Sequence, residues 1–143
     1  MTAKMTIAEL EAFLHAEFPQ AFRTGGDIAI ESADGRSCRL RQRFNERMLR
    51  PGGTVSGPVM MTLADVALYV AILARIGIVP LAVTTHLSIN FLRKPRADRR
   101  VVARCRLMKL GKTLAVGEVW IFSEGEDEPV AHATGTYAIP PKR

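Results

Sequence analysis

Residues 56–76, SGPVMMTLADVALYVAILARI, decide the fold, because they form the longest helix candidate in the chain. Ser56 is a favourable N-cap, and Pro58 suits the first turn, where its missing N–H costs nothing. Gly77 follows as a plausible end of the helix. The segment is apolar on nearly every side, so we expect a helix that is buried over most of its surface.

One carboxylate interrupts this apolar helix. Asp65 is the only charged residue between Arg50 and Arg75. Burying an unpaired carboxylate is costly, so Asp65 needs a partner in any case. The residue pattern leaves two interpretations open: a structural carboxylate bonded to an arginine or to backbone donors, and a catalytic one.

The start of the same helix offers a second chemical group. Its first backbone N–H groups lack acceptors within the helix, and Gly57 presents such an N–H to an oxyanion without an obstructing side chain. An ordinary capped helix end explains the pattern more simply. Ser56 and Asp65 are nine residues apart, which is about 13 Å along the axis. A site that uses both features therefore needs the helix of a second subunit, as in a homodimer.

The other segments predict one α+β domain over residues 1–143, with its core at about 27–139. A capping box of Thr6 and Glu9 begins a short amphipathic helix over about 6–18. Asp34-Gly35 predicts a hairpin of two strands, and residues 45–55 are expected to form a loop. After the long helix, the pattern predicts strands near 81–92, 100–110, 113–123 and 129–139. This order indicates a largely antiparallel sheet that wraps around the long helix.

Side chains in the strand at 81–92 divide between two faces. Apolar side chains dominate one face, and the polar side chains are expected on the other: Thr84, His86, Ser88 and Asn90. A polar strand face is usually solvated or part of an interface.

Composition narrows the class of protein. The chain has 143 residues, of which 48% are hydrophobic, so wholesale disorder is excluded. Acidic residues occupy the place of a signal-peptide core, and the apolar stretch after residue 51 is interrupted, so we expect a cytoplasmic protein that does not enter a membrane. Cys38 and Cys105 stand alone and predict neither a disulfide framework nor a metal site. The net charge of +6 fits a polyanionic partner or simply a basic surface.

Four segments together resemble the PaaI-type branch of the hot-dog-fold thioesterases. They are SGPVMMTLADVALY, AVTTHLSINFLRKP, LMKLGKTLAVGEVWIF and VAHATGTYAI, and they cover about residues 36–139 in the order and spacing of that family. The resemblance implies a long central helix inside a curled antiparallel sheet. It also implies hydrolysis of acyl-CoA thioesters at sites that two subunits share, in a dimer or a tetramer.

The resemblance also implies roles for individual residues. Asp65 matches the acid that activates water or attacks the thioester carbonyl, and Gly57 matches the glycine whose N–H holds the thioester oxygen. Thr84 falls where a Ser or Thr supports the acid or the water. Two positions depart from the family pattern: Ser56 replaces a histidine, and Arg50 replaces an asparagine.

Coenzyme A, with its phosphates, is a specific candidate for the polyanionic partner that the basic net charge indicates. Arg93 and Lys94 at the end of one strand and Lys112 at a hairpin tip are candidates for its phosphates. Asn90 and Arg50 complete the set of expected substrate contacts, and Gly53 keeps a family glycine. The resemblance implies no metal and no redox cofactor.

Three alternatives remain open. The changes at Ser56 and Arg50 favour a hot-dog protein that binds acyl-CoA or merely assembles, without catalysis. A basic strand face favours a nucleic-acid binder, although no aromatic residues interleave with its arginines, which are Arg39, Arg41 and Arg43. A hot-dog dehydratase would need a pair of a histidine and an acid, which the sequence does not display.

Overall fold

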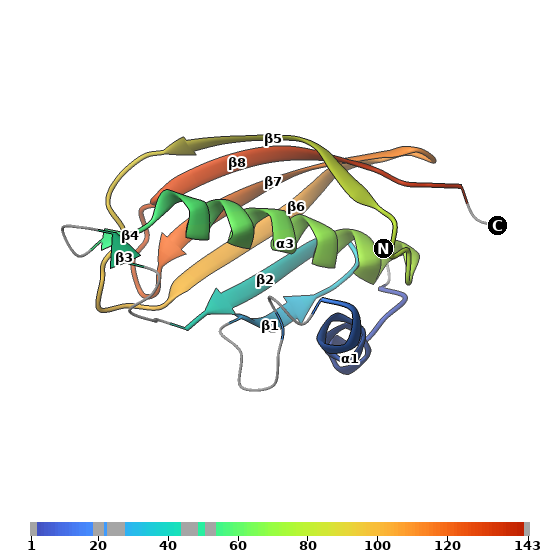
Figure 1. The fold of residues 1–143 in the computed structure, drawn as a ribbon, viewed down its shortest axis with the longest axis horizontal. Coiled ribbons are helices and arrows are strands. Elements are labelled where there is room, and N and C mark those ends of the chain that lie inside the picture. Colours follow the sequence, from blue (N-terminus) through green and yellow to red (C-terminus); the bar gives the residue numbers. More distant parts are fainter. Residues whose placement is uncertain (1–2, 19–21, 23–27, 44–48, 51–53, 142–143) are drawn as a thin grey trace.

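The structure is a computed structural model that describes residues 3–18, 22, 28–43, 49–50 and 54–141. A six-stranded antiparallel sheet lies along one long helix (Figure 1). The strand order β1-β2-β6-β7-β8-β5 leaves β1 and β5 as the two edges of a sheet that is not closed into a barrel. The elements in chain order are α1 (Ile7–Glu17), β1 (Ile28–Ala33), β2 (Ser37–Gln42), β3 (Leu49–Arg50), β4 (Thr54–Val55), α3 (Gly57–Ile76), β5 (Val83–Phe91), β6 (Val101–Leu110), β7 (Leu114–Ser123) and β8 (Ala131–Ala138).

Helix α3 begins and ends where the sequence predicts. The Ser56 hydroxyl accepts a hydrogen bond from the Val59 N–H at 3.4 Å, and Gly77 ends the helix with a φ of 90°. By length and composition the helix could span a membrane, with a mean hydropathy of 1.9, but 67% of that window is buried inside the protein. Packing against the sheet therefore accounts for its apolar character.

Two glycines that face each other in the sheet let α3 approach it closely. Gly117 of β7 and Gly135 of β8 face each other across the two strands. A Cβ atom at these positions would lie 2.7 Å and 2.5 Å, respectively, from the methyl groups of Leu68, which is only 1% exposed. The paired glycines thus provide the space that Leu68 fills, and they set the separation between helix and sheet.

Helix α1 packs against β1 and α3 at one end of the molecule (Figure 1). Its capping box is present as predicted: the Glu9 N–H donates to Thr6 Oγ1 at 3.1 Å, and the Thr6 N–H donates to Glu9 Oε1 at 3.0 Å. Leu10 and Leu14, one helical turn apart, are fully buried. These two side chains attach α1 to the core.

The β1–β2 hairpin also follows the prediction. Asp34 Oδ1 accepts hydrogen bonds from the N–H groups of Arg36 and Ser37 at 2.9 Å and 2.7 Å, and Gly35 has a φ of 92°. The predicted loop at 45–55 differs, because β3 and β4 pair there as a two-residue ladder. Two-residue strands are too short to leave a periodic signal in the sequence.

Strand β5 contains an extra residue that the alternation rule missed. Thr84 pairs with Tyr137, but His86 already pairs with Thr136, so Thr85 has no partner residue of its own in β8. Such a bulge changes which face of the sheet the preceding side chains occupy. The prediction that Thr84 shares the polar face of His86 is therefore wrong. Thr84 points toward α3, whereas His86 and the polar residues after it lie on the outer face.

Candidate active site

Asp65 is half-buried, and two hydroxyl groups hold its carboxylate. Thr84 Oγ1 donates to Asp65 Oδ1 at 2.6 Å, and the Tyr137 hydroxyl lies 2.8 Å from the same oxygen. The Tyr137 hydroxyl also lies 3.0 Å from the Asp65 backbone carbonyl oxygen. Among the described residues, no hydrogen bond reaches Oδ2. One carboxylate oxygen is thus fixed in place while the other stays available.

Tyr137 is a site residue that the sequence analysis missed. Burial raises the pKa of its phenol above the ordinary value, and the nearby Asp65 carboxylate contributes to the rise. The phenol therefore stays neutral and can only orient the carboxylate as a hydrogen-bond donor at ordinary pH. A signal did exist: Tyr137 falls on the buried face of a predicted strand, where a phenol needs a polar partner.

A pocket of about 320 Å³ opens beside Asp65. Its walls combine apolar and polar side chains, and helix α1 with its C-cap supplies Phe13, Glu17 and Phe18. On the α3 side, Tyr69 stacks on Tyr137 with ring centroids 6.0 Å apart. The sequence predicted α1 as a helix but did not connect it with the site, because only the tertiary packing brings the two ends of the chain together.

The α3 start lies away from this pocket within one chain. Gly57 and Asp65 are eight residues apart, about 12 Å along the helix axis. The Gly57 N–H belongs to the first turn, where no carbonyl group one turn earlier in the helix can accept it. A Cβ atom at Gly57 would lie 3.2 Å from the Phe91 ring, so this glycine sits against the far end of β5. Ser56 acts as the N-cap, as predicted.

The charged candidates lie at two ends of the sheet. Lys112 is exposed in the β6–β7 turn, at the end where Thr84 and Tyr137 pair. Arg93 and Lys94 follow the opposite end of β5, and Arg93 is ion-paired with Glu128. The Arg93 Nε–H also donates to the Pro129 carbonyl oxygen at 2.9 Å. One subunit alone does not bring these cations together.

Three other expected contacts are placed differently or not at all. Asn90 pairs with His132 on the outer face of the sheet, away from Asp65. The Arg50 backbone pairs with Thr54 in the β3–β4 ladder, and nothing is described of its side chain. Gly53 lies outside the described residues.

The structure contains a histidine–acid pair that the sequence did not reveal. His132 Nε2 lies 3.1 Å from Glu118 Oε2, with the two residues on neighbouring strands. The pair occupies the outer face, whereas Asp65 lies on the helix side, so it does not complete a dehydratase site with Asp65. No cluster of three or more His, Cys, Asp or Glu side chains suited to a metal ion occurs within the described part of the chain.

Comparison with known proteins adds family information to this geometry. The profile of the Thioesterase superfamily matches residues 52–130. A protein of Saccharolobus solfataricus, named as a candidate esterase, is 30% identical over 135 residues, which are 94% of this chain and 86% of that protein. A crystal structure from Silicibacter sp. TM1040, named as a candidate thioesterase, is 46% identical with a TM-score of 0.90 and covers 99% of this chain and 96% of its own.

The PaaI protein of the E. coli phenylacetic acid degradation operon has the same fold, with 24% identity and a TM-score of 0.71 over 92% of this chain and 90% of that one. Together with the described sheet and helix, these matches confirm the hot-dog fold and the resemblance to PaaI-type proteins, and they support hydrolysis of thioesters. The chain belongs to the thioesterase superfamily.

Proposed function

We propose that the protein hydrolyses an acyl-CoA thioester to a free acid and coenzyme A, at sites that two subunits share. The proposal rests mainly on the Asp65 carboxylate, which two hydroxyl donors hold by one oxygen beside a pocket partly lined by aromatic and aliphatic side chains. A carboxylate held in this way can act on a carbonyl group that the pocket positions.

The distances within one chain support the need for a second subunit. Gly57 lies against Phe91 at one end of β5, whereas Asp65 bonds to Thr84 at the other end. Antiparallel pairing of the β5 edges of two copies brings the Phe91 end of one strand beside the Thr84 end of the other. Gly57 of the partner subunit then lies near Asp65, and the two-fold symmetry creates two equivalent sites.

Exposed apolar side chains along this edge support the same pairing. Val83 and Phe91, at the two ends of β5, are 54% and 50% exposed. Met61 lies on α3 between Gly57 and Asp65 and is 38% exposed. An unpaired sheet edge with apolar side chains tends to associate with another chain, and a second copy of β5 satisfies this edge.

The chemistry follows from the placement of the donors and acceptors. The acyl group occupies the pocket between α1 and α3, and the Gly57 N–H of the partner subunit holds the carbonyl oxygen as negative charge develops on it. Asp65 Oδ2 takes a proton from a water that attacks the carbonyl carbon. Alternatively, it attacks that carbon itself and expels the thiolate, and water then hydrolyses the resulting anhydride to the free acid. Thr84 and Tyr137 keep the carboxylate in one orientation. The coenzyme A thiolate leaves readily because a thiolate is a much weaker base than an alkoxide, so the site needs no strong general acid.

Pairing of two subunits also brings together cations that lie at opposite ends of the sheet within one chain. Lys112 lies at the Thr84 end of the sheet, and Arg93 and Lys94 follow the opposite end of β5. In the antiparallel dimer, Arg93 and Lys94 of the partner subunit approach the Lys112 end. The phosphates of coenzyme A can then meet cations from both chains.

Thiol release from a panel of acyl-CoA esters, from short aliphatic to aromatic, tests this proposal. We expect turnover of at least one ester, and Asp65→Asn lowers kcat/KM by about 100-fold or more because it removes the base. Asp127→Asn, at an exposed aspartate between β7 and β8, is the matched control and keeps full activity. Binding of coenzyme A without turnover of any ester would establish the non-catalytic alternative, and full activity in Asp65→Asn would place the base elsewhere.

A further inference from the structure

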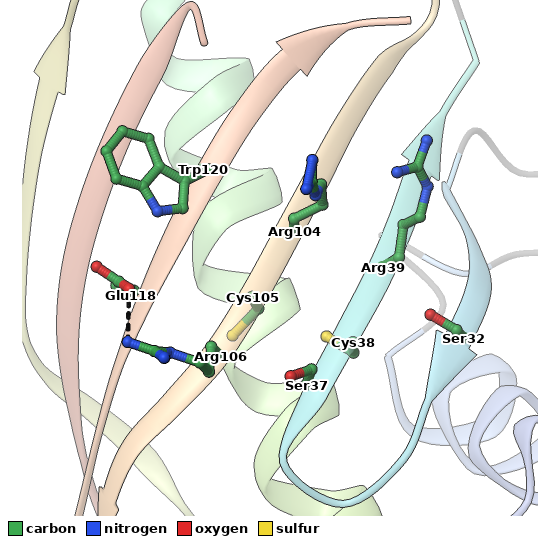
Figure 2. Close-up of a pocket in the computed structure, with 9 residues that line it drawn as sticks. All are labelled: Ser32, Ser37, Cys38, Arg39, Arg104, Cys105, Arg106, Glu118 and Trp120. Carbon is green, nitrogen blue, oxygen red and sulfur yellow. Dashed lines mark hydrogen bonds and ion pairs between the residues drawn. The ribbon is translucent and has the colours of Figure 1, made fainter. Parts of the chain in front are cut away.

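The outer face of the sheet carries a row of polar side chains that crosses four strands. The register sets Ser32 opposite Arg39, Arg39 opposite Arg104, and Arg104 opposite Trp120. Figure 2 shows these side chains spread over the strands, with the helix behind the sheet. The row is therefore separated by the sheet from Asp65 and its pocket.

This row lines a hollow of about 530 Å³. Arg106 and Glu118, which face each other on β6 and β7, add a second row beside the first. Cavities that bind small molecules usually have volumes of about 300–1,000 Å³. The hollow thus has the size of a site for a small organic ligand.

The lining carries more positive than negative charge. Arg39 faces Arg104 directly, and like charges opposite each other destabilise a sheet. Arg39 is paired with Glu31 at 3.4 Å, and Arg106 is paired with Glu118 at 3.2 Å. Within the described part of the chain, Arg104 forms no ion pair.

The Arg104 guanidinium lies over an aromatic ring. Its guanidinium carbon lies 5.0 Å from the centre of the Phe122 ring. Stacking on a ring orients a guanidinium plane but leaves its N–H edge free to donate to a phosphate or carboxylate. An anion in the hollow also relieves the repulsion between Arg39 and Arg104.

Trp120 supplies an aromatic surface beside this cation. It is 38% exposed, and its ring centre lies 4.0 Å from that of His132 at an angle of 43°. His132 is in turn bonded to Glu118 at 3.1 Å, which limits the motion of the indole. Flat heterocycles stack favourably on such a side chain.

The acidic turn after β7 limits the size of the anion. A neighbouring hollow of about 240 Å³ shares Arg39 and Arg104 with the first one, and its other walls include Glu124, Glu126 and Asp127. These carboxylates repel a polyanion that continues across the face. They favour a compact ligand with one or two phosphates over a nucleic-acid strand.

We propose that this outer-face groove, lined by Arg39, Arg104, Arg106 and Trp120, binds a nucleoside mono- or diphosphate. The base stacks on Trp120, and the phosphate lies between the guanidinium groups of Arg39 and Arg104. The groove is a second ligand site, independent of the thioester chemistry at Asp65.

Trp120 is the only tryptophan of the chain, so its fluorescence reports directly on the groove. In titrations with ADP, AMP, adenosine and inorganic phosphate, with absorbance by the nucleotides corrected, we expect saturable quenching by ADP or AMP below about 1 mM. Adenosine and inorganic phosphate each bind at least about tenfold more weakly, because each makes only half of the contacts.

Substitutions distinguish a direct contact between Arg104 and ADP from a general effect of the protein's net charge on ADP binding. We expect Arg104→Ala to weaken ADP binding by about tenfold or more, and Arg104→Lys to have an intermediate effect because the fork of donors is lost while the charge stays. Arg36→Ala removes an exposed arginine outside the groove and should leave ADP binding unchanged. Thermal melting checks that each variant is folded, and calorimetry confirms the affinities without the fluorophore.

Four binding results would overturn the proposal, and a fifth result would reassign the groove to the substrate. The four are the absence of saturable binding of any nucleotide, equal affinity in Arg104→Ala, inorganic phosphate that binds as tightly as ADP, and a single-stranded oligonucleotide that binds more tightly than either nucleotide. Displacement of ADP by coenzyme A, with a raised KM for acyl-CoA in Arg104→Ala, would assign the groove to the substrate and exclude a separate site. Nucleotide binding is measured without any catalytic turnover, so the result of this test does not depend on whether the protein is a thioesterase.

Discussion

The shared site can be tested by combining two inactive chains. Asp65→Asn removes the proposed base, and Gly57→Val places a branched side chain where the thioester oxygen must reach the backbone N–H. A Cβ atom at Gly57 would lie 3.2 Å from the Phe91 ring, which lies on the β5 edge that pairs in the proposed dimer. Thermal melting therefore verifies that each variant folds, and size-exclusion chromatography verifies that it still dimerises, before activity is measured.

The expected recovery follows from the geometry. If Gly57 and Asp65 of different chains form one site, a mixed dimer contains one site with both residues intact and one site with both changed. Each parent should lose about 100-fold in activity or more, since a base and an oxyanion donor each contribute at least that much. The mixed dimer should regain about half of the wild-type turnover per dimer, with an unchanged KM.

Co-expression with two different affinity tags, followed by purification on both, isolates the mixed dimer for the thiol-release assay. The control is a dimer with both tags in which each chain carries Asp65→Asn, and it should remain inactive. If the mixed dimer is no more active than its parents, while each chain is folded and the dimer is intact, a site built from two chains is refuted. Activity near the wild-type value would also contradict it, because only one of the two sites can be restored.

Two further substitutions test the support of the site and the packing of the fold. Tyr137→Phe removes the phenol donor to Asp65, and we expect it to lower the free energy of unfolding in urea by about 1.5 kcal/mol. This value is near the lower end for a hydrogen bond to a charged group, because Asp65 is partly solvated. An unchanged urea midpoint would contradict the prediction. Gly135→Ala places a Cβ atom 2.5 Å from a Leu68 methyl group, and overpacking of this kind should cost about 1–3 kcal/mol. Adding Leu68→Ala should then cost less than the sum of the two single changes, whereas strictly additive losses would show that the two residues do not compete for space.

Local chemistry explains the elements that could be predicted from the sequence. Ser56 and Gly77 mark the ends of α3, and Asp34-Gly35 marks the β1–β2 turn, because caps and turns depend on residues close together in the chain. The need of Asp65 for a partner was also predictable, since it follows from the cost of burying a charge. The nature of that partner was not predictable: two hydroxyl groups bond to the Asp65 carboxylate, and within the described part of the chain no arginine or backbone N–H does.

The failures of prediction share one physical cause. The bulge at Thr85 depends on how β5 pairs with β8, and strict alternation along a single strand carries no information about such pairing. Tyr137 reaches Asp65 across 72 residues of sequence. The walls that α1 contributes to the pocket likewise come from the other end of the chain. These contacts exist only after the sheet and the helices have packed.

The sequence by itself determined that one buried helix with a single acid lies against an antiparallel sheet, because periodicity, capping and burial are local properties. The rise per residue of a helix was also enough to show that Gly57 and Asp65 of one chain lie too far apart to share a carbonyl group. Only the tertiary structure decided that Thr84 turns toward Asp65, that Tyr137 joins it, and that the arginines of β2 and β6 meet Trp120 on the outer face. Those outcomes depend on strand register and on the bulge in β5, and register is set by the packing of the whole sheet.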